Sequence, residues 1–240
     1  MGSGTVFERY EIKYIITEKQ KELIKNGMEK YMAPDKYGRS VIRNIYYDTA
    51  DSRLIRRSNE KPVYKEKLRV RSYKRVESDD ETVFVELKKK YNSVVYKHRT
   101  VLSENTAAKW LNDGQLPQEQ TQIISEIEYF RRFYGSLVPS AFVSYDREAF
   151  FAVDGSDFRV TFDENISART TDLSLKKDVG GEKLLGNGLV LMELKTHSGI
   201  LLWMTSLLSE NEIYKTSFSK YGTAYRTMIF PEKGEVKNVC

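Results

Sequence analysis

Polar and apolar residues alternate with a period of two through most of this sequence, and no other feature constrains the fold as strongly. Successive side chains of a β-strand point to opposite faces, so this alternation is typical of strands with one buried face. The pattern predicts about eight strands, over Phe7 to Ile15, Arg43 to Asp48, Tyr64 to Tyr73, Thr82 to Lys89, Ser93 to Leu102, Ser140 to Phe150, Phe158 to Phe162 and Gly188 to Thr196.

Weaker helical signals lie between these strands. Thr17 and Gln20 have the spacing of a capping box, and Ser103 is a second favourable helix N-cap. Strands joined by short turns and interrupted by helices indicate an α+β domain with a mainly antiparallel sheet. Helices are predicted over Thr17 to Met32, Ser103 to Asn112, Gln118 to Tyr134, Gly199 to Glu210 and Thr216 to Ile229.

Length and composition set outer limits on the domain organisation. A chain of 240 residues with 40% hydrophobic residues can bury a substantial core. We interpret residues 5–230 as one domain, residues 1–4 as a tag or disordered start, and residues 231–240 as a C-terminal tail. The longest apolar stretch, Ile200 to Met204, is too short for a membrane segment, and no signal-peptide pattern is present, so a cytoplasmic location is expected. The oligomeric state stays open.

Cysteine and histidine content excludes several kinds of site. The chain has one cysteine, Cys240, and two histidines, His98 and His197, which excludes an internal disulfide and a Cys- or His-rich metal site. The net charge of +5 is too small by itself to identify an anionic partner, and DNA is not an expected partner. The positions of the charged residues along the chain are therefore more informative than their total.

Charged residues share one face in six of the predicted strands. If these strands close into a barrel with helices outside, the apolar faces meet the helices and the charged faces line a lumen. In an open sheet the same faces would only be solvated, but the repetition over six strands favours the lumen. The sets are Lys65, Lys67, Arg69 and Arg71; Arg9, Glu11 and Lys13; Glu86 and Lys88; Tyr145 and Arg147; Arg159, Thr161 and Asp163; and Glu193 and Lys195.

Cations crowded on one wall require anions. Residues two apart on a strand lie about 6.6 Å from each other. At an effective dielectric near 20, each neighbouring pair of cations repels by about 2.5 kcal/mol, more than the ~1 kcal/mol span of β-propensity. Glu11, Glu86 and Glu193 are predicted to offset part of this repulsion. A chain of phosphates would supply the rest through charge-assisted hydrogen bonds of roughly 1.5 to 3 kcal/mol each.

A series of short motifs, taken in the order of the chain, covers nearly the whole segment from Phe7 to Arg226. They are Arg9-x-Glu11-x-Lys13-Tyr14, Ile45-Tyr46-Tyr47-Asp48, Leu68-Arg69-Val70-Arg71, Val83-Phe84-Val85-Glu86-Leu87-Lys88, Tyr145-Asp146-Arg147, Arg159-Val160-Thr161-Phe162-Asp163, Met192-Glu193-Leu194-Lys195 and Ser217-Phe218-Ser219-Lys220-Tyr221. This set resembles the CYTH-like triphosphate tunnel metalloenzymes, and within them the polyphosphate polymerase domain of the vacuolar transporter chaperone complex and its bacterial relatives. The resemblance implies a closed antiparallel β-barrel that forms a triphosphate tunnel, with helices packed outside.

The resemblance also implies which residues act. Glu193, together with Glu11, would hold Mn²⁺ or Mg²⁺ against the phosphates. The family's hydrolytic enzymes open with Glu-x-Glu-x-Lys, whereas Arg9 here replaces the first glutamate. The implied catalytic residues are Lys13, Arg69, Arg71, Lys88 and Glu193. The implied substrate-binding residues are Lys13, Arg69, Arg71, Lys88, Lys97, Tyr145, Arg147, Arg159, Lys195, Ser217 and Lys220.

The activity implied by the resemblance is polyphosphate synthesis from ATP or another triphosphate. The terminal oxygen of inorganic polyphosphate would attack the γ-phosphorus and release ADP, and this anionic nucleophile needs no general base. Two alternatives stay open. A metal-dependent triphosphatase would use Glu11 or Glu86 to orient water. A non-catalytic polyphosphate- or RNA-binding module would stack bases on tyrosines, namely Tyr46, Tyr47, Tyr64 and Tyr73.

The run Lys88-Lys89-Lys90 separates the two faces of one strand. The alternation places Lys88 and Lys90 toward the lumen and Lys89 on the outside. Lys89 is therefore predicted to be dispensable for activity, whereas Lys88 is not.

Overall fold

The computed structural model describes residues 10–92, 94–197 and 199–231. The predicted tag or disordered start over residues 1–4, the strand start at Phe7, the residue Arg9 and nearly all of the predicted tail lie outside these ranges.

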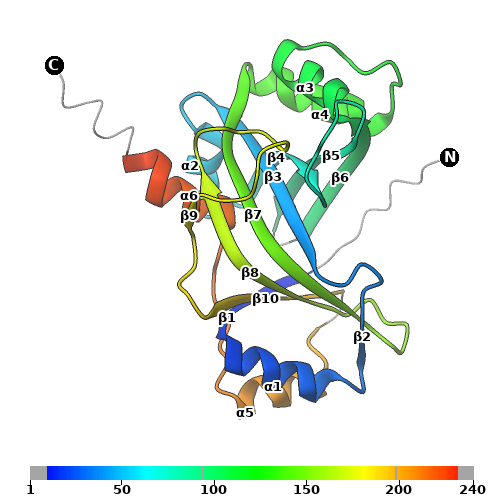
Figure 1. The fold of residues 1–240 in the computed structure, drawn as a ribbon, viewed down its shortest axis with the longest axis vertical. Helices are drawn as coiled ribbons and strands as arrows, with labels where there is room; N and C mark the ends of the chain where they lie inside the picture. Colours follow the sequence, from blue (N-terminus) through cyan, green and yellow to red (C-terminus); the bar gives the residue numbers. More distant parts are fainter. Residues whose placement is uncertain (1–9, 93, 198, 232–240) are drawn as a thin grey trace.

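One antiparallel sheet contains all ten strands of the described ranges (Figure 1). Hydrogen-bonded neighbours follow the order β1-β10-β8-β7-β3-β4-β5-β6, while β2 pairs with β7 and β9 pairs with β8. The eight predicted strands are confirmed with shifted ends, as β1 Tyr10–Thr17, β3 Ser40–Thr49, β4 Tyr64–Ser72, β5 Thr82–Tyr91, β6 Val94–Ser103, β7 Leu137–Ala152, β8 Arg159–Arg169 and β10 Leu189–Thr196. The sequence did not predict the short strands β2 Met32–Pro34 and β9 Glu182–Lys183.

The predicted closed barrel is confirmed only as a curved antiparallel sheet. The edge strands β1 and β6 do not pair with each other within the described ranges. The free edge of β1 instead receives residues from near the C-terminus, because the Thr216 amide donates to the Lys13 carbonyl at 2.8 Å. Lys88 of β5 also reaches Glu11 of β1 through an ion pair. The Glu11–Lys88 ion pair therefore joins the two sides of the curved sheet where strand hydrogen bonds do not, and the short bridge covers part of the free edge of β1.

The helices begin and end at residues with clear local causes. The predicted capping box is confirmed, since the Gln20 amide donates to Thr17 Oγ1 and the Thr17 amide donates to Gln20 Oε1. The helix predicted from Thr216 begins only at Lys220, because Thr216 pairs with β1 and Ser219 caps the helix. The helices are α1 Glu18–Met28, α2 Arg53–Asn59, α3 Glu104–Asp113, α4 Gln122–Tyr134, α5 Leu202–Glu210 and α6 Lys220–Ala224, which continues as a π-helical turn over Tyr225–Ile229. The sequence did not predict α2.

Two hydrophobic cores lie between the sheet and the helices outside it. Helices α3 and α4 cover β4 and β5, where Leu68 and Leu87 pack with the fully buried Trp110. Helices α1 and α5 cover β1, β8 and β10 (Figure 1). Met192 of β10 and Met204 of α5 belong to the same buried cluster there. The apolar faces of the strands thus meet the helices, as the alternation predicted. No helix of the described ranges has the length and apolar character that a membrane span requires.

A third hydrophobic cluster lies on the concave side of the sheet. It contains Ile42, Val143 and Tyr221, and it joins β3 and β7 to α6 and the π-helical turn. The rings of Tyr46 and Tyr221 stack with centroids 4.6 Å apart. This cluster fills one part of the concave side, and the charged faces of the strands occupy the remainder.

Candidate functional site

A cavity of about 2040 Å³ occupies the concave side of the sheet. Among the residues that the structure describes, eighteen lysines and arginines line it, but only three carboxylates do, namely Glu11, Asp35 and Glu193. The whole chain carries 39 basic and 34 acidic residues, so its small net charge hides a strong separation of charge. Such a concentration of cations in a partly enclosed space produces a strongly positive potential that attracts anions.

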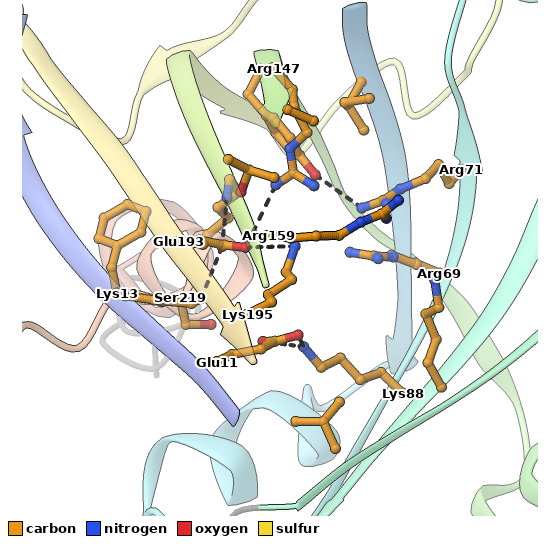
Figure 2. Close-up of a pocket in the computed structure, with 18 of the residues that line it drawn as sticks. Glu11, Lys13, Arg69, Arg71, Lys88, Arg147, Arg159, Glu193, Lys195 and Ser219 are labelled. Carbon is orange, nitrogen blue, oxygen red and sulfur yellow. Dashed lines mark hydrogen bonds and ion pairs between the residues drawn. The ribbon is translucent and has the colours of Figure 1, made fainter. Parts of the chain in front are cut away.

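All the site residues predicted from the sequence line this cavity. Figure 2 shows many of them converging from β1, β4, β5, β7, β8 and β10. Their roles in binding and catalysis stay predictions. The residues brought together are Glu11, Lys13, Arg69, Arg71, Lys88, Lys97, Tyr145, Arg147, Arg159, Glu193, Lys195, Ser217 and Lys220.

Glu193 is the centre of a cluster of four cations. One carboxylate oxygen lies 3.4 Å from Lys13 Nζ and 3.5 Å from Lys220 Nζ. The other lies 3.5 Å from Lys195 Nζ and 3.7 Å from an Arg147 nitrogen (Figure 2). Burial alone would raise the pKa of Glu193, but these cations hold the pKa well below its usual range. Glu193 is therefore ionised at neutral pH, and one negative charge is shared among four positive ones.

Asp163 binds two of these four cations, Arg147 and Lys220. Arg147 donates to it with two nitrogens, each at 2.6 Å, and Lys220 Nζ donates to the same carboxylate. Asp163 is fully buried, and the surrounding cations lower its pKa against the effect of burial. A buried bidentate pair of this kind holds the guanidinium of Arg147 in one orientation. The alternation predicted that Asp163 faces inward, but Asp163 is not among the predicted site residues.

Arg69 of β4 is oriented by a buried carboxylate and by a tyrosine hydroxyl. Arg69 donates to Glu86 Oε2 at 2.7 Å and to the Tyr46 hydroxyl at 3.2 Å. Glu86 is wholly buried, and Arg99 and Lys97 approach its other oxygen at 2.5 and 3.7 Å. Burial would raise the pKa of Glu86, but these cations keep it well below the usual value.

Arg71 is positioned by neutral partners. Its Nε donates to Asn44 Oδ1 at 2.8 Å, and its Nη2 donates to the Tyr145 hydroxyl at 3.0 Å. Both partners face the same side of the sheet as Arg71, so strand alternation is the signal that could have identified Asn44. The hydrogen bonds orient the guanidinium without neutralising it, and Glu86 lies 3.9 Å from its Nε, so most of its charge is available to a ligand.

Arg159 and Lys88 differ in whether a carboxylate neutralises them. Arg159 has no carboxylate partner within the described ranges, and Figure 2 shows it pointing toward Arg71. Lys88 Nζ lies 2.7 Å from Glu11 Oε2, and the pKa of Glu11 is lowered to about 2, because Lys88 and Lys195 outweigh the effect of burial. Lys89 lies on the outside, 3.6 Å from Glu126 of α4, as its place in the alternation predicted.

Two side chains that the sequence analysis left out of the site contact each other in the cavity wall. Lys67 Nζ donates to Ser219 Oγ at 2.9 Å. Burial, together with Lys13, Lys65 and Lys88, lowers the pKa of Lys67 to about 7. The predicted residue Ser217 also lines the cavity, two positions before Ser219.

Thr161 presents a polar atom without a partner. It is 95% buried, lines the cavity and lies directly opposite Glu193 in the β8–β10 register. Within the described ranges its hydroxyl makes no hydrogen bond. Buried hydroxyls in native proteins are normally satisfied by protein, water or a ligand. This hydroxyl is therefore available to water or to a polar ligand beside Glu193.

The protein residues do not by themselves fit a metal ion. Mn²⁺ and Mg²⁺ prefer about six oxygen ligands, yet no group of three histidine, cysteine, aspartate or glutamate residues is placed to bind one within the described ranges. Glu193 is already shared among four cations, and Glu11 is paired with Lys88. The predicted metal roles of Glu193 and Glu11 therefore stay predictions, and they require additional oxygens from a bound phosphate chain.

Comparisons with known proteins agree with this architecture. A family model described as the VTC domain matches residues 8–229. A candidate adenylate cyclase from Bacillus halodurans has 12% sequence identity and a TM-score of 0.56, with 92% of this chain and 100% of that chain covered. A candidate adenylyl cyclase from Hippeastrum, described as having a dominant triphosphatase activity, has 15% identity and a TM-score of 0.56, with 92% and 96% covered. At this identity the two likenesses show a shared fold. No curated protein sequence matches the chain.

Proposed function

This chain belongs to the VTC domain family, and we propose that it is a phosphotransferase that moves the γ-phosphoryl group of ATP onto a growing polyphosphate chain in its basic cavity. The observation that carries the proposal is the composition of the cavity wall, in which eighteen cations face three carboxylates. Even when Glu86 and Asp163 behind the wall are included, the cations outnumber the carboxylates by more than three to one. A linear polyanion is the ligand that would balance this charge.

The reaction requires positioning and charge neutralisation more than acid–base chemistry. A terminal oxygen of the polyphosphate attacks the γ-phosphorus of ATP, the new O–P bond forms, and the bond to the β-phosphate oxygen breaks to release ADP. Because the attacking oxygen is already anionic, no proton has to be removed. The absence of histidine from the described cavity wall is compatible with this chemistry.

The role proposed for each residue of the cavity wall follows from the ion pairs and hydrogen bonds that it already makes. Arg71 Nε lies 3.9 Å from Glu86, and Arg159 forms no ion pair within the described ranges, so their charges are at most weakly neutralised. They would contact the transferring phosphoryl group and its developing negative charge. Arg147 and Lys220 are oriented by Asp163 and would hold neighbouring phosphates in fixed positions. Thr161 would donate its unpaired hydroxyl to a phosphate oxygen beside Glu193.

A metal-dependent triphosphatase is the second candidate, because the Hippeastrum neighbour is described as having that activity. Hydrolysis requires a group that orients water, and Glu11 or Glu86 is the predicted choice. Glu11 is held by Lys88, however, and Glu86 is wholly buried under Arg69 and Arg99. Glu86 is thus closed to water in the cavity, and Glu11 would have to orient water while it is held by Lys88, so phosphoryl transfer to an anionic acceptor has the stronger support.

A non-catalytic RNA-binding module has less support from the tyrosines proposed for base stacking. Tyr47 is 96% buried and contacts Asn112 of α3, and Tyr64 donates to Glu66 on the outer face of β4. Tyr46 is covered by Tyr221. Of the four candidate rings, only Tyr73 is both exposed and part of the cavity wall.

Product analysis tests the proposed function. Purified protein is incubated with ATP and Mn²⁺ or Mg²⁺, and the products are separated by chain length on a gel. We expect long phosphate chains and ADP, and we expect Arg159→Ala to remove most of this product while changing the stability of the fold little, because this side chain is exposed. Orthophosphate and ADP without longer phosphate chains would support the triphosphatase instead, and binding without turnover would support the binding module.

A further inference from the structure

Four lysines form two directly opposed pairs on the cavity face of β4 and β5. In the antiparallel register Lys65 lies opposite Lys90, and Lys67 lies opposite Lys88. All four line the cavity. Like charges in directly opposed cross-strand positions destabilise a strand pair. We call these four residues the lysine ladder. The repulsion among their ammonium groups lowers the stability of the ligand-free fold.

Protein groups neutralise only a small part of the lysine ladder. Lys88 pairs with Glu11, but Lys67 is hydrogen-bonded only to the Ser219 hydroxyl and Lys65 to the Ser58 carbonyl, at 2.9 and 3.3 Å. Lys90 has no ion-pair partner within the described ranges. One carboxylate therefore serves four ammonium groups. Burial and repulsion among these lysines lower the pKa values of Lys65, Lys67 and Lys90.

The neighbouring pair of the same two strands is balanced. Arg69 lies opposite Glu86, and the two side chains form an ion pair at 2.7 Å. The excess charge is therefore specific to the part of the strand pair that begins at Lys67 and Lys88. It continues to Lys65 and Lys90, which lie about 6.8 Å further along the strands.

We propose that the lysine ladder is a second anion subsite, which binds the phosphoryl units of linear polyphosphate beyond the three of a bound triphosphate. This inference rests on the proposed function for its choice of ligand. Three of the four lysines, Lys65, Lys67 and Lys90, are additional to the site residues predicted from the sequence. The ladder extends the binding path from Arg69 by two pairs of lysines, so a longer chain meets more cations than a triphosphate does.

The placement of aromatic residues favours polyphosphate over a nucleic acid as the occupant. On the cavity side of this strand pair, the aromatic residues are Phe84 and Tyr73. Phe84 lies opposite Arg71, six residues and about 20 Å along the strand from Lys65. A nucleic acid requires stacking surfaces beside its phosphates, whereas polyphosphate requires only cations. The lysine ladder offers ammonium groups at regular intervals, and the two cavity-lining rings of this strand pair, Phe84 and Tyr73, lie at the far end of the strands from Lys65 and Lys90.

The test is the dependence of affinity on chain length in a double variant, Lys65→Ala with Lys90→Ala. Calorimetric titrations with tripolyphosphate and with a long linear polyphosphate are compared for this variant, for wild type and for Lys89→Ala, a control on the outer face of the same strand. Wild type and the control should bind the long chain more tightly than tripolyphosphate. The double variant should keep its tripolyphosphate affinity within a few-fold and lose about tenfold or more for the long chain.

Three results would overturn the proposal. An equal loss for both ligands would place these lysines in the triphosphate site itself, and no loss for either would make them bystanders. A long single-stranded RNA that loses affinity as strongly as polyphosphate would identify a general polyanion surface. Thermal melting of the double variant controls for folding, and removal of two repelling cations should not lower its Tm. If wild type fails to extend polyphosphate but shows this chain-length dependence, the proposed activity fails and the subsite stands.

Discussion

Lys88 Nζ of β5 lies 2.7 Å from Glu11 Oε2 of β1, although these strands stand near opposite ends of the strand order. Glu11 also faces Lys195 in the β1–β10 register. The ion pair thus brings the two sides of the curved sheet together across the cavity. Lys88 is consequently both a structural contact and a cation of the proposed substrate site.

Lys88→Ala and Lys89→Ala form a matched pair of variants. We expect Lys88→Ala to reduce turnover by about tenfold or more, because it removes a phosphate-binding cation and leaves Glu11 unpaired in the cavity. Lys89→Ala should have activity near wild type, because Lys89 contacts Glu126 on the outside. Steady-state rates with ATP at matched protein concentration provide the comparison. Equal losses in the two variants would show that the assignment of strand faces is wrong.

Glu193→Gln tests the role of the central carboxylate. The substitution leaves Lys13, Lys195, Lys220 and Arg147 without their shared negative charge, so the ligand-free protein should melt at a lower temperature. Tripolyphosphate should restore much of the lost Tm, because phosphates replace that charge. Turnover should also respond less to Mn²⁺ than it does in wild type. A metal response identical to that of wild type would count against Glu193 as a ligand.

Asp163→Asn should act mainly on stability. Asp163 is fully buried between Arg147 and Lys220, so its replacement leaves buried charge uncompensated, at a cost of about 3 to 5 kcal/mol in the free energy of unfolding. Because the pKa of Asp163 is lowered, its contribution is present above the unfolded-state pKa and is lost as the pH falls through the folded-state pKa. Urea unfolding at neutral and acidic pH measures both effects. A variant as stable as wild type at neutral pH would contradict this role.

Lys67 should make polyphosphate binding depend on protons. Its pKa of about 7 leaves it partly neutral in the ligand-free protein just above neutral pH, and a bound anion would favour the charged form. Binding near pH 7.5 should therefore take up protons, which calorimetry detects as a binding enthalpy that varies with the ionisation enthalpy of the buffer. Lys67→Met should reduce this dependence, and an uptake unchanged in that variant would assign the protons to another group.

The same lowered pKa has a consequence for the ligand-free protein. Between pH 7 and about 10.5 the unfolded chain holds a proton on Lys67 that the folded chain lacks, so this lysine makes the free energy of unfolding rise with pH. Chemical unfolding of wild type and Lys67→Met across this interval isolates the contribution. The difference in stability between the two proteins should change in the direction that favours wild type as the pH rises.

Metal binding should require the phosphate chain. Since Glu193 and Glu11 are each engaged by cations, the ligand-free protein is expected to bind Mn²⁺ weakly. Addition of tripolyphosphate should make Mn²⁺ binding tight, because phosphate oxygens complete the ligand set. Electron paramagnetic resonance of free Mn²⁺ measures the bound fraction. Stoichiometric binding by the ligand-free protein would show that a resident metal site exists.

Local patterns were sufficient to predict most of the sheet, because the direction of each strand side chain follows from its position in the alternation. Leu68 and Leu87 face the outer core and Arg69 and Lys88 face the cavity, as the period of two requires. The start of α6 could not be predicted in this way. Thr216 is not helical because its amide donates a hydrogen bond to the Lys13 carbonyl, about 200 positions earlier in the chain.

The residues of the candidate site were also predictable from strand alternation, but their contacts with one another were not. Alternation identifies the residues that face the cavity, but it does not show which of them hold each other. Asn44 and Tyr46 orient Arg71 and Arg69 across neighbouring strands, and these contacts depend on the register of β3 with β4. Sheet closure depends likewise on Glu11 and Lys88, whose contact no local pattern specifies.

A crystal structure with a non-hydrolysable triphosphate analogue and Mn²⁺ tests the central claim most directly. We predict that the phosphates lie inside the cavity, in contact with Arg71, Arg159 and the Thr161 hydroxyl, with the metal between Glu193 and phosphate oxygens. Phosphates bound on the outer surface, or a cavity in which these side chains contact no phosphate, would contradict it.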